Sequence, residues 1–212
     1  MRIVEPLLVS ILVVTPARAE SEPVRRFDVA ASVGYAFPLG SSERGARLSD
    51  ATFGNAAVDL AAAYRLSERL ALLLSGRYGA VVPTLCTDTS DCISSLGHDV
   101  ILTLRARIFL PRLLGADPYG DVGFGYEWFV SKLADSGATS THSYDGPILV
   151  STELGVPFEV GRRWTFGPAL GLGLGTFIGS RLEAPGIAQE ESVSDRSIHA
   201  WLSLVVRTSV QF

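Results

Sequence analysis

The chain has 212 residues, of which 47% are hydrophobic and 21 are glycines, and its formal net charge is −4. This length fits a single domain. The acidic balance does not favour nucleic acid as a partner, because nucleic-acid binding needs a basic surface.

Residues 1–19 have the features of a secretory signal peptide. An apolar run from Pro6 to Val14 is followed by Ala17-Arg18-Ala19, which has the A-x-A form of a cleavage site. The competing interpretation is a membrane anchor, but the run is far shorter than the roughly 20 residues that a spanning helix needs. We therefore expect residues 1–19 to be removed during export and residues 20–212 to form the mature domain.

Eight segments alternate apolar and polar residues with a period of two, which is typical of β-strands whose two faces meet different surroundings. We predict strands at residues 27–37, 55–66, 69–81, 98–110, 118–131, 146–160, 163–179 and 196–212. In each segment one face is free of charge, and in the sixth this face consists of Ile148, Val150, Thr152, Leu154, Val156 and Phe158. An arginine or lysine at the lipid midplane costs about 2–4 kcal/mol, so the charge-free faces indicate lipid contact. The predicted fold is all-β, an eight-stranded antiparallel transmembrane β-barrel.

Two prolines fall inside predicted strands, Pro157 in the sixth and Pro168 in the seventh. Because proline cannot donate a hydrogen bond to the ladder, we expect a bulge or a strand end at each. The boundaries of these two strands depend on the outcome.

The face opposite the charge-free face carries acids, arginines and glycines. Its charged members are Asp28, Asp59, Arg65, Arg77, Asp99, Arg105, Arg107, Asp121, Glu127, Glu153, Glu159 and Arg207. Eight strands enclose an interior that side chains can fill, so we expect these charges to pair across the lumen and plug it. The alternative is that they line a narrow wet path through the barrel.

The predicted connections alternate in length. They are short at residues 67–68, 111–117 and 161–162, and long at 38–54, 82–97, 132–145 and 180–195. Outer-membrane barrels place short turns in the periplasm and long loops outside. With a periplasmic N-terminus, aromatic residues then form two interfacial girdles. The inner girdle comprises Phe27, Tyr64, Phe158, Trp164 and Phe212, and the outer girdle comprises Tyr35, Phe37, Tyr78, Tyr126 and Trp128.

The only two cysteines, Cys86 and Cys92, bracket the sequence CTDTSDC in the second long loop. Disulfides persist in exported proteins, so we predict that these cysteines form a loop-closing disulfide. A metal site that adds Asp88 and His98 is the alternative, but CxxxxxC is not a usual zinc spacing, and no metal is expected. No cofactor is expected either, because GLGLGTFIG departs from the G-x-G-x-x-G phosphate motif at Ile178 and no helix follows it.

The last twelve residues, WLSLVVRTSVQF, alternate until the chain ends on Phe212. This ending resembles the C-terminal signature of bacterial outer-membrane proteins, and residues 27–212 resemble the small eight-stranded barrels of the OmpA transmembrane domain, OmpX and OmpW types. The resemblance implies that Phe212 is an assembly signal for the barrel-assembly machinery. It also implies a monomer in the Gram-negative outer membrane, in contact with lipid and lipopolysaccharide.

We therefore expect a structural or surface-interaction protein whose exposed loops carry any specific binding. A narrow passive channel for small solutes is the first alternative. The second is a lipid-modifying enzyme, since some small outer-membrane barrels act on lipid A or phospholipids, and His142, Ser143 and Asp145 lie together in the third long loop. His98 and His199 are expected at the outer rim of the lumen. A triad needs its base within hydrogen-bond reach of the nucleophile, which adjacency in sequence does not establish, so no enzyme is predicted.

Overall fold

The structure is a computed structural model that describes residues 26–43, 46–83, 96–135, 138–194 and 196–212. The predicted signal peptide and the two cysteines, Cys86 and Cys92, lie outside the described residues. In the described part of the chain, no helix is long and apolar enough to cross a membrane.

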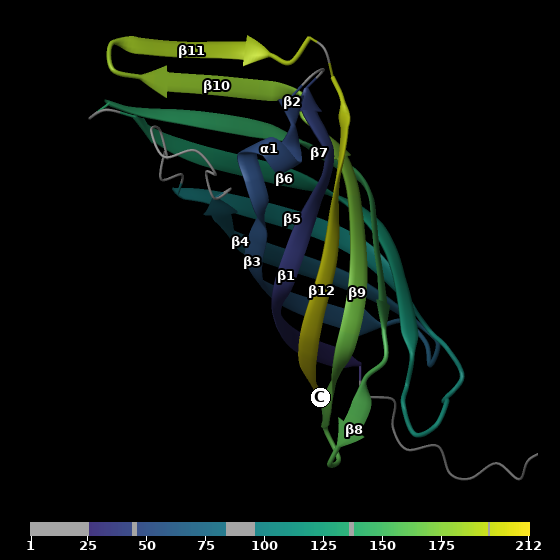
Figure 1. Cartoon of the computed structure of the whole chain (residues 1–212). Coiled ribbons are helices and arrows are strands. Elements are labelled where there is room, and N and C mark those ends of the chain that lie inside the picture. Colours follow the sequence, from purple (N-terminus) through teal and green to yellow (C-terminus); the bar gives the residue numbers. More distant parts are fainter. Residues whose placement is uncertain (1–25, 44–45, 84–95, 136–137, 195) are drawn as a thin grey trace, which may run out of the picture.

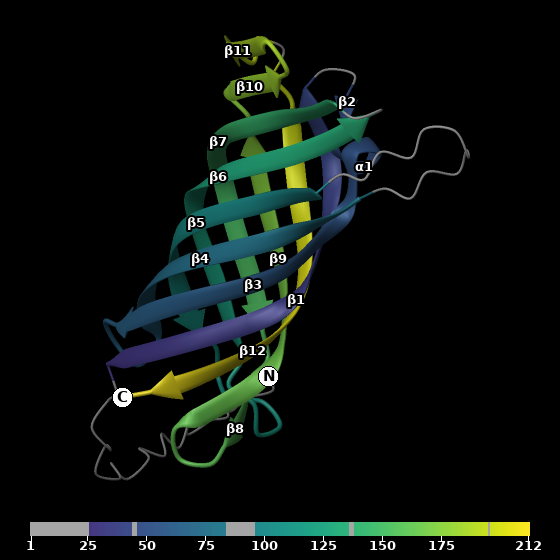
Figure 2. The ribbon, with the colours of Figure 1, turned by 90° about the vertical axis from the view of Figure 1, so that its left-hand side faces the viewer.

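Eight long antiparallel strands close into a barrel (Figures 1 and 2). They are β1 (Phe27–Glu43), β3 (Thr52–Arg65), β4 (Leu70–Pro83), β5 (Leu96–Phe109), β6 (Tyr119–Asp135), β7 (Ala138–Gly155), β9 (Trp164–Thr176) and β12 (Ile198–Gln211). Each strand pairs with the next in this order, and β12 pairs with β1 to complete the ring. The predicted fold class is confirmed.

In the described part of the chain, four short strands and one helical turn lie at the two ends of the barrel (Figure 1). At one end, β2 (Ala46–Arg47) pairs with β1, α1 (Leu48–Ala51) precedes β3, and β10 (Gly179–Ala184) with β11 (Ile187–Ser192) extends the sheet beyond β7. We call this the loop end. At the other end β8 (Phe158–Val160) pairs with the start of β9, and the backbone of Phe212 bonds to that of Phe27. We call this the C-terminal end.

Several strands extend further toward the loop end than the sequence predicted. β1 continues to Glu43, β6 to Asp135, and β7 begins at Ala138, so most of two predicted loops is sheet. The fourth predicted long loop, residues 180–195, contains the β10–β11 hairpin.

The two prolines behave differently. Pro157 lies between the end of β7 and the start of β8, so a strand end is present there, as expected. Pro168 lies inside β9, in unbroken register with Val206 of β12, and marks no strand end. The opposite edge of β9 pairs with β8 before Pro168 and with β7 after it. Pro168 thus lies between two ladders, where a backbone N–H donor is not needed.

The outward face is apolar along most of the barrel, but β7 changes phase in its middle. The register of β7 shifts between Ile148 and Val150 against β9. Ile148 is 2% exposed, whereas Leu149 is 53% exposed. An extra residue in a strand transfers the following side chains to the other face. The prediction that Ile148 faces lipid is therefore wrong, because this bulge turns it into the barrel.

The interior at the loop end is filled by apolar side chains. Leu48 of α1 and Val193 of the β11–β12 connection pack there with side chains that the strands point inward. The cluster consists of Ala36, Leu48, Val81, Ile101, Phe129, Ile148, Phe177, Val193 and Trp201. We call it the apolar cap. Two buried acids, Asp99 and Glu127, lie among the cap residues, opposite Phe129 and Ile101 in the ladder, and most other charged inward residues lie between the cap and the C-terminal end.

Candidate functional site: the charged interior of the barrel

Alternation along the strands places the predicted charges inside. Successive side chains on a strand point to opposite faces, so Arg105 and Arg107, two positions apart on β5, both enter the lumen. Asp121 of β6 lies directly opposite Arg107 in the ladder, and Glu153 of β7 lies opposite Asp121. Three neighbouring strands thus bring arginines and carboxylates to one level of the barrel.

Glu153 lies at the centre of these charges. Its carboxylate is 3.1 Å from Arg105 and 2.9 Å from Arg207, which comes from β12 on the other side of β9. The hydroxyl of Tyr119 donates a hydrogen bond of 2.7 Å to the same carboxylate. Glu153 is only 2% exposed, so both ion pairs are shielded from water.

Arg107 and Asp59 complete the group. Arg107 donates two hydrogen bonds to Asp121, at 2.8 and 2.9 Å, and its guanidinium stacks 3.6 Å from the ring centre of Tyr119. Such bidentate pairs are among the stronger hydrogen bonds in proteins. Asp59 lies 3.3 Å from Arg207 and 4.0 Å from Arg105. We call Arg105, Arg107, Arg207, Asp59, Asp121 and Glu153 the arginine cluster; it is buried and its charges balance.

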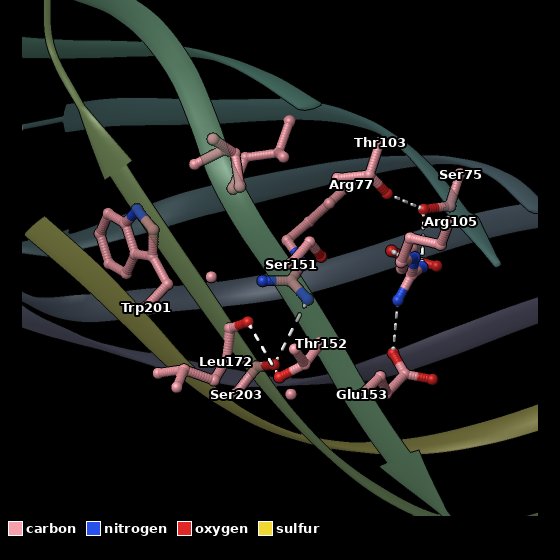
Figure 3. A pocket seen from close by; sticks show the side chains of 15 residues that line it. Ser75, Arg77, Thr103, Arg105, Ser151, Thr152, Glu153, Leu172, Trp201 and Ser203 are labelled. Carbon is pink, nitrogen blue, oxygen red and sulfur yellow. Dashed lines mark hydrogen bonds and ion pairs between the residues drawn. The ribbon is translucent and has the colours of Figure 1, made fainter. Parts of the chain in front are cut away.

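A small cavity lies between the arginine cluster and the apolar cap (Figure 3). Its volume is about 20 Å³, which is room for about one water molecule. Arg77 borders it and donates a 3.3 Å hydrogen bond to Ser203, while Arg105 donates one of 2.7 Å to Ser75. The interior is therefore nearly filled at this level, and the remaining space lies beside Gly173 on the wall, where an added Cβ would meet no heavy atom within 4 Å.

A second polar group lies toward the loop end, among the residues of the apolar cap. Glu127 is fully buried and accepts a 2.8 Å hydrogen bond from the indole N–H of Trp201, and its other oxygen lies 2.7 Å from Nε2 of His199. The His199 ring stacks on Phe177 with ring centres 4.1 Å apart. His199 is therefore buried, and the expectation that it lies at the outer rim of the lumen is wrong, because Phe177 of the apolar cap packs against its ring.

The interior is more open at the C-terminal end. A vestibule of about 250 Å³ there reaches the far side of the arginine cluster at Arg107 and Arg207. Its wall also includes Asp28, and Arg65, whose guanidinium lies 4.2 Å from the ring centre of Phe109. Solvent entering from this end therefore meets the paired charges first.

Most of the predicted lumen charges lie inside the barrel. Asp28, Asp59, Asp99, Arg105, Arg107, Asp121, Glu127, Glu153 and Arg207 are buried, and Arg65 and Arg77 are partly buried. Glu159 is different: it lies on the short strand β8, is about half exposed, and pairs with Arg112 at 2.8 Å. The Glu159 carboxylate raises the pKa of that arginine through this hydrogen bond. Phe212 is exposed at the C-terminal end.

Sequence reasoning missed several uncharged partners of these charges. Tyr119 and Trp201 donate to buried carboxylates, and Asn55 donates a 2.9 Å hydrogen bond to Asp99. All three occupy inward positions of their strands, so the same alternation that located the charges would have located them. A search of the inward positions for uncharged side chains that can donate a hydrogen bond would have found all three.

The residues of the hypothetical triad are not brought together. His142 and Ser143 are consecutive in β7, so their side chains point to opposite faces of the sheet. Asp145 accepts a hydrogen bond from the Tyr126 hydroxyl. His98 faces outward and bonds to the Tyr78 hydroxyl at 2.9 Å. Among the described residues, no group of three or more His, Cys, Asp or Glu side chains is placed to hold a metal ion.

Solved structures share this closed arrangement of strands. The outer membrane protein OprG from Pseudomonas aeruginosa matches with a TM-score of 0.57 and 14% identity, over 89% of this chain and 97% of that one. The fold is that of the small outer-membrane β-barrels. A major outer membrane protein from Thermus thermophilus (TM-score 0.56, 14% identity, 88% and 98% coverage) and Neisserial surface protein A (0.53, 13%, 88% and 97%) match similarly. No protein-family model and no curated protein sequence matches the chain.

Proposed function

We propose that this chain is a structural or surface-interaction protein of the Gram-negative outer membrane, with a lumen that is closed to solutes. In this proposal the mature protein is residues 20–212, a monomer in contact with lipid and lipopolysaccharide. Phe212 presents the terminal signal to the barrel-assembly machinery. Exposed segments at the loop end carry any specific contacts.

The apolar belt supports a place in a membrane. Large hydrophobic side chains are exposed all around the barrel, among them Leu60, Leu74, Leu104, Phe124 and Leu204. Soluble monomeric proteins rarely expose apolar patches larger than a few hundred Å². A continuous apolar belt is stable when it faces lipid. Strands of outer-membrane barrels alternate in this way, with apolar side chains outward and polar side chains inward.

The positions of two pairs of aromatic residues support the predicted girdles. At the C-terminal end the rings of Phe27 and Tyr64 are 5.2 Å apart. Toward the loop end, Tyr126 and Trp128 are 4.8 Å apart on the outward face of β6. Amphipathic rings favour membrane interfaces, so this spacing supports a bilayer between the two levels.

The closed lumen is inferred from the arginine cluster. Its side chains reach across the barrel from β3, β5, β6, β7 and β12 and bond to one another. The adjoining cavity holds about one water, and the apolar cap fills the level above it. An ion passing through would have to separate buried pairs, which costs about 3–5 kcal/mol when one partner is lost.

Single-channel recording of the refolded protein in a planar bilayer tests this proposal. We expect the wild type to insert without conductance steps. Arg105→Ser removes a guanidinium that spans the cluster, and adding Trp201→Ala opens the apolar cap above it, so this double variant should produce steps, whereas Arg112→Ser, an exposed arginine outside the lumen, should stay silent. Wild-type steps that change size in Arg105→Ser would overturn the closed lumen and establish the narrow channel instead.

A further inference from the structure

A large hollow lies on the outside of the barrel, at the loop end. It is a groove of about 610 Å³ between the β6–β7 pair and the β10–β11 hairpin. Its wall includes Trp128, Val130, Ser143, Asp145, Arg181 and Glu190. Its volume falls within the range of about 300–1,000 Å³ that is typical of ligand pockets.

Strand register explains how these side chains meet. Val130, Ser143, Arg181 and Glu190 are opposite one another on four consecutive strands, and so form one row on the outward face. In the neighbouring row, Trp128 of β6 lies opposite Asp145 of β7. Cross-strand neighbours on one face are close enough to act together. The groove is therefore a built surface of the sheet and not a gap between loops.

The carboxylate of Asp145 is held in a defined position. One of its oxygens accepts a hydrogen bond from Tyr126. The other lies over Gly179, where an added Cβ would come within 2.4 Å of it. Only a glycine at that position leaves space for the carboxylate, so the two residues together fix an acidic group at the base of the groove.

The groove has an excess of negative charge. Among the described lining residues, Arg181 is the one arginine or lysine, and it pairs with Glu183 at 2.7 Å and with Glu190 at 3.0 Å. Two glutamates thus share one arginine, and Asp145 and Glu191 add two further acids. Lys132 is on the same outward face but one row beyond Val130, opposite Thr141. Such a lining repels a phosphate and attracts a cation.

Trp128 adds an aromatic surface beside these carboxylates. It is 42% exposed and lines the groove. The face of an indole attracts ammonium groups. From Trp128 the outward face of β6 continues through Phe124 to Val122, which are both exposed and apolar. A ligand with a cationic head beside Trp128 therefore has an apolar surface available for a tail.

We propose that this groove binds the organic ammonium group of an amphiphile. The ammonium lies between Asp145, Glu190 and the indole of Trp128, and the tail follows β6 toward Val122. This goes beyond the proposed function, because it assigns a site and a ligand class to the outer surface. Only the burial of the tail in lipid rests on the proposed membrane location; recognition of the charge does not.

Titration calorimetry on the purified protein in nonionic micelles tests the proposal. The probe is dodecyltrimethylammonium, and dodecyl maltoside is the neutral probe of the same chain length. We expect the cationic probe alone to bind the wild type, and more weakly as salt rises. Tetramethylammonium, which lacks a tail, should bind more weakly than the amphiphile.

The matched variants are Asp145→Asn with Glu190→Gln, and Glu159→Gln as an exposed, ion-paired control at the opposite end of the barrel. Loss of two exposed charge contacts should weaken binding about tenfold in the double variant, and the control should bind as the wild type does. Circular dichroism confirms that each variant retains its strands. Equal affinity in the double variant and the control would overturn the proposal, as would equal binding of the neutral probe.

Two membrane arms identify the source of the amine. The loss of probe affinity caused by the double variant is measured in discs of phosphatidylethanolamine and in discs of phosphatidylglycerol. A smaller loss in phosphatidylethanolamine supports a lipid headgroup as the resident ligand, because that headgroup competes with the probe. An equal loss supports a soluble cationic amphiphile. Neither result depends on conductance, so failure of the closed lumen and failure of this site are distinguishable.

Discussion

Neutralising the carboxylate at the centre of the arginine cluster should destabilise the barrel strongly. Glu153→Gln keeps the size of the side chain but removes the charge that faces Arg105 at 3.1 Å and Arg207 at 2.9 Å. Removing one partner of a buried ion pair typically costs about 3–5 kcal/mol, because the other charge is left uncompensated.

The remaining partners place the expected loss at the lower end of this range. Arg207 retains Asp59 at 3.3 Å, and Arg105 retains Asp121 at 3.7 Å. We therefore expect the free energy of unfolding to fall by about 3 kcal/mol. With a urea m-value of about 2 kcal/mol per molar, the unfolding midpoint should fall by about 1.5 M.

Urea titration of the protein in lipid vesicles, followed by tryptophan fluorescence, measures this loss. Glu159→Gln is the matched control, since Glu159 pairs with Arg112 at 2.8 Å but both side chains are about half exposed. Exposed pairs contribute about 0–1 kcal/mol. Adding Arg105→Gln to Glu153→Gln should recover part of the loss, with a coupling of about 0.5–3 kcal/mol. A Glu153→Gln loss no larger than that of the control would refute the assignment of this cluster as the internal plug.

Three further predictions test other parts of the molecule. Leu104→Arg, in the middle of the outward face of β5, should lower the free energy of unfolding in vesicles by about 2–4 kcal/mol. Leu110→Arg, just beyond the end of that strand, should lower it by about 0–1 kcal/mol, and equal losses would contradict lipid contact. Gly123→Ala should lower the free energy of unfolding by about 1–3 kcal/mol, because its Cβ would lie 2.1 Å from a backbone oxygen. Gly173→Ala should be tolerated, and the urea titration compares the two variants. Finally, the intact mass of the unreduced, denatured protein should equal that of a chain with one disulfide, and alkylation of both cysteines without reductant would disprove the bond.

Much of the barrel could be predicted because one rule governs it. A strand between lipid and a polar interior must alternate, so the period of two located every long strand and the inward charges. The rule fails where the sequence does not alternate. The run from Pro147 to Val150 contains no polar residue. The sequence therefore does not show which of these side chains point into the barrel and which point outward. Packing with the apolar cap selected the phase that buries Ile148.

The ends of the strands were less predictable. Glu159 is six residues after Glu153, so a continuous strand would point both side chains inward. The strand β7 ends at Gly155, however, and the alternation does not predict the direction of side chains beyond that residue. The β10–β11 hairpin turns at Pro185-Gly186, a dipeptide that marks tight turns and could have predicted it. The groove is formed by the pairing of β6 with β7, β7 with β10, and β10 with β11. The sequence of one strand does not show how its residues align with those of its neighbours, so the groove could not be predicted.

The pairing of charges across the lumen could not be derived from any single segment, and it explains why charges are retained there. Arg207 is on the last strand and contacts Asp59 and Glu153, which are on the second and sixth long strands of the chain. These contacts form only when β12 has joined β1 in the correct register. A shift of one residue would turn Arg207 toward lipid, at a cost of about 2–4 kcal/mol. An apolar interior of equal volume would fill the space without this penalty, so the arginine cluster favours one closure of the barrel over its neighbours in register.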